Sequence, residues 1–127
     1  MLRYSSILLI GALLSGAATH CRAETVLHTF KGSPDGEYPV SSLVSDSQGN
    51  LYGTTAGGGN PACEIGYDGC GTIYELSPLQ PGKWKFQIIF EFEGYNGADP
   101  LAGLLFDGNG DLYGTTAFGG LRHGLLG

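Results

Sequence analysis

The clearest pattern along the chain is an alternation of apolar and polar residues that begins at residue 84. One set of alternating positions is wholly apolar, while the residues between them are mostly polar. Side chains of an extended strand point to opposite faces in turn, so this period of two predicts a half-buried β-strand. The apolar set consists of Trp84, Phe86, Ile88, Phe90 and Phe92. We therefore expect a strand over residues 84–92 with one face turned toward a neighbouring layer.

Three shorter segments before residue 84 also have the pattern of β-strands. They cover residues 40–46, 50–55 and 71–76, and Ser77 and Pro78 are expected to close the third. Between the first two, Asp46 in first place and Gly49 in fourth place suit a type I turn followed by a left-handed residue. Four antiparallel strands in about 60 residues are typical of one blade of a β-propeller.

The segment 39–59 recurs as segment 100–120 at a constant offset of 61 residues. The first copy reads PVSSLVSDSQGNLYGTTAGGG and the second reads PLAGLLFDGNGDLYGTTAFGG. The turn residues Asp46 and Gly49 therefore recur as Asp107 and Gly110. Repetition at this spacing indicates stacked or radial modules, each of which buries its apolar face against a neighbour.

Composition supports an all-β fold and excludes one class of partner. Glycine accounts for 23 of the 127 residues, which disfavours long helices because glycine is a poor helix former. The net charge is −6, from 12 acidic and 6 basic residues. A nucleic-acid-binding protein would carry a positive surface instead. We therefore expect no nucleic-acid partner.

The N-terminus has the pattern of a secretory signal peptide. Arg3 precedes an apolar run over residues 7–18, and Cys21 and Ala23 supply small residues at the −3 and −1 positions of a cleavage site. The run is shorter than the roughly 20 residues that a transmembrane helix needs, which disfavours the alternative of an uncleaved anchor. We expect residues 1–23 to be removed, and residues 24–127 to be secreted or held at the cell surface with no membrane span.

Cleavage after Ala23 would leave two cysteines, Cys63 and Cys70. An even number of thiols in an oxidising compartment favours a disulfide, and the glycines between them let the chain turn back. Free thiols and a metal site are the alternatives. Two thiols alone fall short of the four ligands that a structural zinc takes.

Two further features suggest chemistry but have simpler structural explanations. Residues 107–111 resemble the start of a calcium loop, yet Leu112 and Phe118 stand where that loop needs glycine and glutamate, so a hairpin turn is favoured. His28 aligns with Phe90 when the copies are superposed, which favours a packed histidine over a general base. We therefore expect no catalytic, cofactor-binding or metal-binding residues.

The repeated strings resemble those of a known family. GNLYGTT at residues 49–55, GTIYELSP at residues 71–78 and GDLYGTT at residues 110–116 are similar to the tandem GloVer repeat of bacterial exported proteins. The resemblance covers nearly all of residues 24–127. It implies a secreted or surface-attached, propeller-like repeat protein whose type of C-terminal anchor varies among members. It carries no catalytic residues with it.

Residues 24–127 hold about one and three-quarter blades. They comprise the last strand of a preceding repeat, a complete repeat over residues 39–99 and a truncated second repeat over residues 100–127. Propellers close with about four to eight blades. We therefore expect an incomplete propeller-like domain, a fragment of a longer protein, that can associate with itself through open sheet edges.

The favoured function is a non-catalytic extracellular binding module for a glycan or a protein. Tyr67, in the loop between the cysteines, is the aromatic residue expected to be exposed for stacking on a sugar. The alternative is a carbohydrate-active hydrolase or lyase whose active site lies outside this chain. That alternative rests on an analogy of fold alone.

Overall fold

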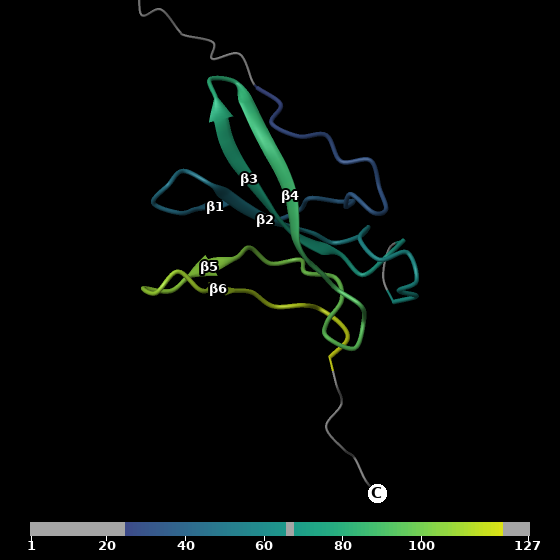
Figure 1. Ribbon diagram of the computed structural model, residues 1–127. Coiled ribbons are helices and arrows are strands. Elements are labelled where there is room, and N and C mark those ends of the chain that lie inside the picture. The colour runs from purple at the N-terminus through teal and green to yellow at the C-terminus, as the bar shows by residue number, and fades with distance from the viewer. Residues whose placement is uncertain (1–24, 66–67, 121–127) are drawn as a thin grey trace, which may run out of the picture.

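The structure is a computed structural model that describes residues 25–65 and 68–120, and these ranges are all β. Figure 1 shows a larger and a smaller antiparallel sheet. The all-β class is confirmed, and no helix occurs in the ranges described. The same ranges form no closed ring of blades. The larger sheet has the order β1 (Val44–Ser45), β2 (Leu51–Thr55), β3 (Thr72–Gln80) and β4 (Lys83–Glu91), and the smaller pairs β5 (Leu105–Phe106) with β6 (Leu112–Tyr113).

The third strand is longer than the sequence pattern predicts. We expected Ser77 and Pro78 to end it, but β3 continues to Gln80, with Pro78 opposite Trp84 of β4. The predicted end of β3 was therefore wrong. Beyond Leu76, β3 no longer pairs with β2 and has β4 as a neighbour on one side only. Proline lacks an N–H group and is tolerated at such an edge.

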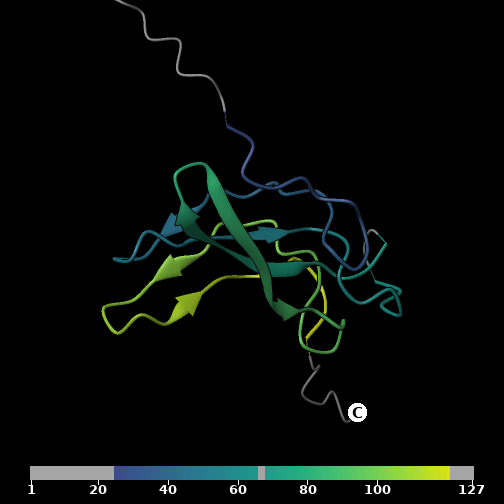
Figure 2. The same ribbon diagram turned by 45° about the horizontal axis from the view of Figure 1, so that its top comes forward.

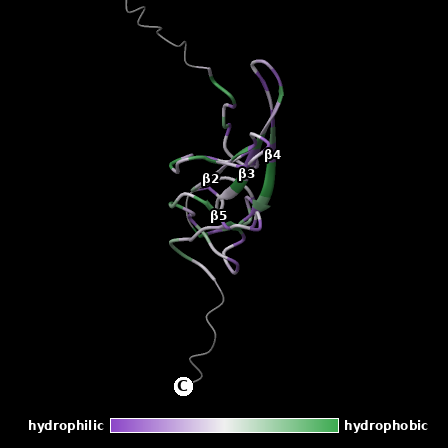
Figure 3. Ribbon diagram, turned by 90° about the vertical axis from the view of Figure 1, so that its left-hand side faces the viewer, coloured by the Kyte–Doolittle hydropathy of each residue, from purple (hydrophilic) through white to green (hydrophobic). Residues whose placement is uncertain are grey.

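The fourth strand does not keep a single apolar face along its whole length. Ile88 lies opposite Tyr74, whereas Phe90 lies opposite Ile73, so Ile89 has no partner and forms a β-bulge. A bulge inserts one extra residue and re-aims the side chains beyond it. Phe90 therefore lies on the opposite face of the sheet from Ile88, in contrast to the predicted alternation. Figure 3 shows hydrophobic residues concentrated in one half of β4.

The larger sheet presents its two faces to different parts of the chain. The face that carries Tyr74 and Phe86 packs against Phe30, whose ring centroid lies 5.0 Å from that of Tyr74. We call it the N-terminal face. The face that carries Thr54 and Ile73 turns toward the second copy of the repeat, and we call it the C-terminal face. Figures 1 and 2 show the smaller sheet on the opposite side of the larger one from the N-terminal segment.

Several threonine side chains are buried in the interior together with the apolar residues. Thr54, Thr55 and Thr72 are almost completely buried, and the Thr55 and Thr72 side-chain oxygens lie 2.7 Å apart in a hydrogen bond. The Thr54 hydroxyl donates to the Pro100 carbonyl oxygen at 2.9 Å, and this contact ties the first sheet to the second copy. Paired in this way, the hydroxyls avoid the free-energy cost of burying an unsatisfied polar group. The buried apolar residues are Ala56, Cys70, Tyr74, Leu76, Phe92, Ala98 and Leu104.

Close contacts of the first copy recur in the second. A side chain at Gly36 would meet Thr55, with its Cβ only 2.9 Å from Thr55 Cγ2. The corresponding Gly97 stands in the same relation to Thr116, at 2.8 Å. Both positions need glycine because another chain segment approaches this closely and because φ is positive at each. The two copies therefore use the same local packing.

The predicted signal peptide, residues 1–23, lies outside the described residues, as does Tyr67. Within the ranges described, no helix has the length and apolar character needed to cross a bilayer.

Candidate functional site

In the first copy, the turn between β1 and β2 is organised by the side chain of Asp46. Its carboxylate accepts hydrogen bonds from the backbone N–H groups of Gln48 and Asn50 at 2.8 and 3.0 Å. The Asn50 amide and the Tyr52 hydroxyl also donate to it, at 2.8 and 3.1 Å. Gly49 has a φ of 84°, in the left-handed region that glycine adopts without strain.

The turn between β5 and β6 repeats this arrangement around Asp107. Its carboxylate accepts hydrogen bonds from the backbone N–H groups of Asn109 and Asp111 at 2.7 and 3.0 Å. The Tyr113 hydroxyl lies 3.5 Å from it, where Tyr52 makes the shorter bond in the first copy. Gly110 has a φ of 91°, matching Gly49. The turn residues singled out by the repeat thus have the same role in both copies.

These hydrogen bonds keep both carboxylates ionised. Burial raises the pKa of Asp46, but the bonds from Asn50, Gln48 and Tyr52 outweigh that effect and hold it below its ordinary value. Backbone N–H groups of Asp111 and Asn109 likewise hold the pKa of Asp107 below its ordinary value. Hydrogen bonds to the charged form of a carboxyl group stabilise it, so each turn carries a fixed negative charge at neutral pH.

The two turns lie side by side and line a shared hollow of about 480 Å³ that is open to solvent. Figure 1 shows both hairpin ends on the same side of the molecule. The Tyr52 and Phe106 rings form part of the wall, packed edge to face with centroids 5.2 Å apart. We call this space the turn hollow. Its lining residues are Ser45, Asp46, Ser47, Gln48, Tyr52, Phe106, Asp107, Gly108 and Gly110.

The turn hollow is suited to hydroxyl-bearing ligands. Its two anionic carboxylates accept hydrogen bonds, and its serine hydroxyls and glutamine amide can both donate and accept. None of the described residues that line it is cationic, so its two carboxylates would repel an acidic ligand without a compensating positive charge nearby. Among the described residues, no three His, Cys, Asp or Glu side chains gather closely enough to hold a metal ion. The lining therefore offers hydrogen-bond acceptors and donors to a polar molecule.

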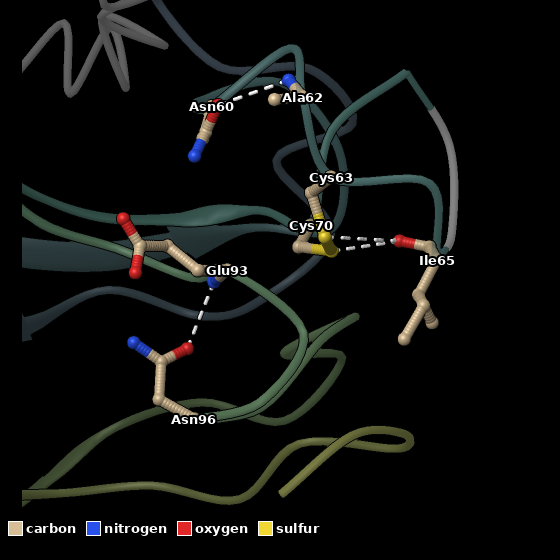
Figure 4. Close-up of a disulfide and its surroundings, with 7 residues drawn as sticks. All are labelled: Asn60, Ala62, Cys63, Ile65, Cys70, Glu93 and Asn96. Atoms are coloured by element: carbon tan, nitrogen blue, oxygen red, sulfur yellow. Dashed lines mark hydrogen bonds between the residues drawn. A yellow bond between two sulfur atoms is a disulfide. The ribbon is translucent and has the colours of Figure 1, made fainter.

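The disulfide expected between Cys63 and Cys70 is present, with the two Cα atoms 5.6 Å apart. Figure 4 shows it at the base of the loop, with the Ile65 carbonyl group directed toward the sulfur atoms. Cys70 is completely buried and belongs to a small cluster with Phe92 and Ala98. The bond therefore fastens the loop to the place where the first copy meets the second.

A second concave feature, of about 300 Å³, lies between the C-terminal face of the larger sheet and the smaller sheet. We call it the inter-repeat groove. Thr54, which donates to Pro100, stands at its wall. The remaining lining residues are Ile73, Phe90, Phe92, Asn96, Pro100, Ala102, Leu104, Leu112, Gly114, Thr115 and Thr116.

His28 packs against the N-terminal face of the larger sheet. Its ring stacks on Phe86 with centroids 3.7 Å apart, so the packing expected for His28 is present. Its Nε2 atom also lies 3.2 Å from a carboxylate oxygen of Asp35. Asp35 in turn accepts a bond from the Lys31 backbone N–H. The stacking on Phe86 holds the N-terminal segment on the sheet, and the contact with Asp35 joins two parts of that segment.

Three features of these sites cannot be recognised in the sequence. The side-by-side placement of Asp46 and Asp107 depends on how the copies pack, although their shared position in the repeat was the available signal. The contact of His28 with Asp35 gives no signal, because Phe90 and Asn96 stand at the corresponding positions of the second copy. Asp99, only 4% exposed and with one carboxylate oxygen unpaired, replaces an exposed tyrosine of the first copy.

Comparison with known proteins identifies one family. A family model described as the Gloeobacter/Verrucomicrobia repeat matches residues 12–126, which include both copies of the repeated segment. No curated protein and no solved structure matches the chain. The family match confirms the resemblance seen in the repeated GNLYGTT and GDLYGTT strings.

Proposed function

Because the chain belongs to the Gloeobacter/Verrucomicrobia repeat family, we propose that it is an exported, non-catalytic repeat protein that binds an extracellular glycan. The turn hollow is the proposed binding site. Export rests on the signal-peptide pattern of residues 1–23, with its apolar run and small residues before the cleavage site. Binding rests on the geometry of the two turns.

The repeats are proposed to be blades of a propeller-like assembly. Three observations support this arrangement: the larger sheet has four antiparallel strands, its two faces pack against different repeats, and local contacts recur from copy to copy. In stacked repeats of this kind, equivalent turns line up along one edge. A ligand could then contact several turns at once.

The observation that carries the proposal is the pair of turn carboxylates in one hollow. Asp46 and Asp107 each keep their charge through hydrogen bonds from their own turn, and both line the same space. Sugar hydroxyl groups are donors that match such acceptors, and apolar sugar faces match aromatic rings such as Phe106. The absence of a basic group among the lining residues favours a neutral or amine-bearing glycan over an acidic one.

The proposal is tested by binding measurements on purified residues 24–127. A glycan array identifies ligands, and calorimetry then measures their affinity. Gly108 lines the hollow, has no atom near the position of an added Cβ and does not have a positive φ, so it can accept a side chain. Gly108→Trp should therefore fill the hollow and abolish glycan binding. Gln48→Ala removes a lining amide and should weaken binding, whereas Gln87→Ala, on the exposed part of β4, should not. Failure to bind any glycan, or equal binding by the Gly108→Trp variant, would contradict the proposal.

A further inference from the structure

The second copy has an open strand edge where the first copy is paired. In the first copy, β2 pairs with β1 on one side and with β3 on the other, from Leu51 opposite Leu76 to Thr55 opposite Thr72. In the second copy, β6 corresponds to β2 and pairs with β5, but its other edge has no strand partner within the described ranges. Unpaired backbone groups on such an edge are ready to bind a further strand.

In the first copy, the side chain of Tyr74 fills the space beside the corresponding edge of β2. Tyr74 is buried, at 4% exposure, and lies over Gly53 of β2. A Cβ at Gly53 would come within 2.6 Å of the Tyr74 hydroxyl oxygen and 2.8 Å of Leu43 Cδ2. The Tyr74 ring also packs edge-on against Phe30. Three residues therefore form a socket for tyrosine: a glycine below, a leucine beside it and a phenylalanine above.

The second copy has the same socket without the tyrosine. Gly114, Leu104 and Phe92 occupy the positions of Gly53, Leu43 and Phe30, and all three line the inter-repeat groove. A Cβ at Gly114 would lie 2.8 Å from Leu104 Cδ2, as a Cβ at Gly53 would from Leu43. The groove of about 300 Å³ is thus the second copy's equivalent of the space that Tyr74 fills in the first.

For two further contacts of the first copy, the second copy contains a counterpart of one of the two residues but not of the other. The Thr55 hydroxyl is paired with that of Thr72, and its counterpart Thr116 lines the groove. His28 is stacked on Phe86 of β4, and its counterpart Phe90 is 43% exposed. The missing halves of both contacts, like the tyrosine, belong to a hairpin of the β3–β4 type.

We propose that the β6 edge and the inter-repeat groove bind the third and fourth strands of another repeat. The incoming hairpin carries a Thr-Ile-Tyr-Glu-Leu sequence like that of β3. Its tyrosine enters the groove opposite Gly114, and its threonine bonds to Thr116. An intact second copy of this chain does not supply that strand, because its own β3 is already paired on both sides. The inference rests on the repeat geometry and not on glycan binding in the turn hollow.

A synthetic peptide of residues 71–94 tests the proposal. It is titrated into the ¹⁵N-labelled chain, and backbone amide shifts are followed by NMR. We expect saturable shifts at residues 112–116, and binding weaker by roughly tenfold or more for the peptide with Tyr74→Ala, because a buried aromatic anchor dominates such interfaces. Shifts at residues 51–55 instead, equal binding of both peptides, or no saturable shift would overturn the proposal.

Variants of the chain supply a matched control. Gly114→Val places a side chain in the socket and should abolish binding, whereas Gln87→Val, on the exposed part of β4, should not. Even if Gly114→Val disturbs the smaller sheet, the comparison of the two peptides on the unmodified chain remains decisive. A dimer of the chain that protects residues 112–116 without any peptide would overturn the proposal by identifying a different occupant. Glycan binding in the turn hollow is measured separately, so the two proposals can fail independently.

Discussion

Tyr38 and Asp99 occupy the same position in the two copies of the repeat and adopt nearly the same left-handed backbone conformation, with φ values of 56° and 54°. Each carbonyl oxygen accepts a hydrogen bond of 3.0 Å, from Ala56 in the first copy and from Ala117 in the second. Tyrosine rarely adopts this conformation, whereas aspartate does so more readily. The backbone geometry is therefore maintained by the repeat, while the side chain changes from an exposed phenol to a buried acid.

Burial raises the pKa of Asp99, which makes its contribution to stability depend on pH. Between the ordinary value of 3.8 and the higher folded value, the folded state binds more protons, so the free energy of unfolding falls as pH rises. Asp99→Asn keeps a residue that tolerates positive φ and removes the charge. It should raise the free energy of unfolding at neutral pH by about 1 kcal/mol. Urea unfolding at several pH values measures this difference.

Asp111→Asn is the control for Asp99→Asn. Asp111 is exposed, and asparagine already stands at the corresponding position 50 of the first copy. This control should leave the free energy of unfolding within about 0.5 kcal/mol of the unmodified chain. An Asp99→Asn variant that is less stable than the unmodified chain at neutral pH would show that the Asp99 carboxylate has a favourable partner.

Thr54 joins the two copies through a buried hydrogen bond, so its hydroxyl group should be important for stability. Thr54→Val removes the donor and leaves the Pro100 carbonyl oxygen without this bond. The expected loss is about 1–3 kcal/mol, the usual consequence of an unsatisfied buried group. Thr115→Val makes the same change at the corresponding exposed position and should cost much less. If urea unfolding showed the same loss in the free energy of unfolding for both variants, the hydrogen bond of the Thr54 hydroxyl group would contribute nothing to stability.

The disulfide between Cys63 and Cys70 closes a short loop at the junction of the copies. Replacing both cysteines by alanine should lower the free energy of unfolding by about 2 kcal/mol, because the unfolded chain gains conformational freedom. Intact mass after alkylation without reductant checks the bond itself. Two alkylated thiols in protein from the exported fraction would contradict it.

The turn carboxylates should make the stability of the folded chain fall as the pH is lowered, whereas Asp99 has the opposite effect. The pKa values of Asp46 and Asp107 lie below 3.8 in the folded state, so their stabilisation is present above that value and is lost as pH falls through the folded values. Asp46→Ala should lower the melting temperature at neutral pH and reduce the decline in acid. Asp107→Ala should do so less, because its bond from Tyr113 is longer than that from Tyr52. Melting curves from about pH 2 to pH 7 test both variants.

The local pattern of residues predicts where the strands and turns of the larger sheet occur, but not how long the strands are or how they combine. Residues 40–46 have the pattern of a strand, yet β1 covers only Val44–Ser45. Alternation from Trp84 predicted β4, yet the bulge at Ile89 depends on its register with β3, a contact between distant segments. The missing N–H group of Pro78 is a local property and predicts a strand end, whereas the tolerance of proline in β3 depends on where pairing with β2 stops. The turn residues Asp46 and Asp107 were visible as a repeated motif. Their shared hollow arises only from packing of the copies.

The bond that joins the copies runs from the Thr54 side chain to main-chain carbonyl oxygens, at Pro100 and, more weakly, at Ala102. Every amino acid has such an acceptor, so this hydrogen bond itself makes no demand on the side chain of the residue that receives it. The donor side must keep a hydroxyl group. As far as this bond is concerned, neighbouring modules can therefore differ in sequence at the receiving position and still be joined.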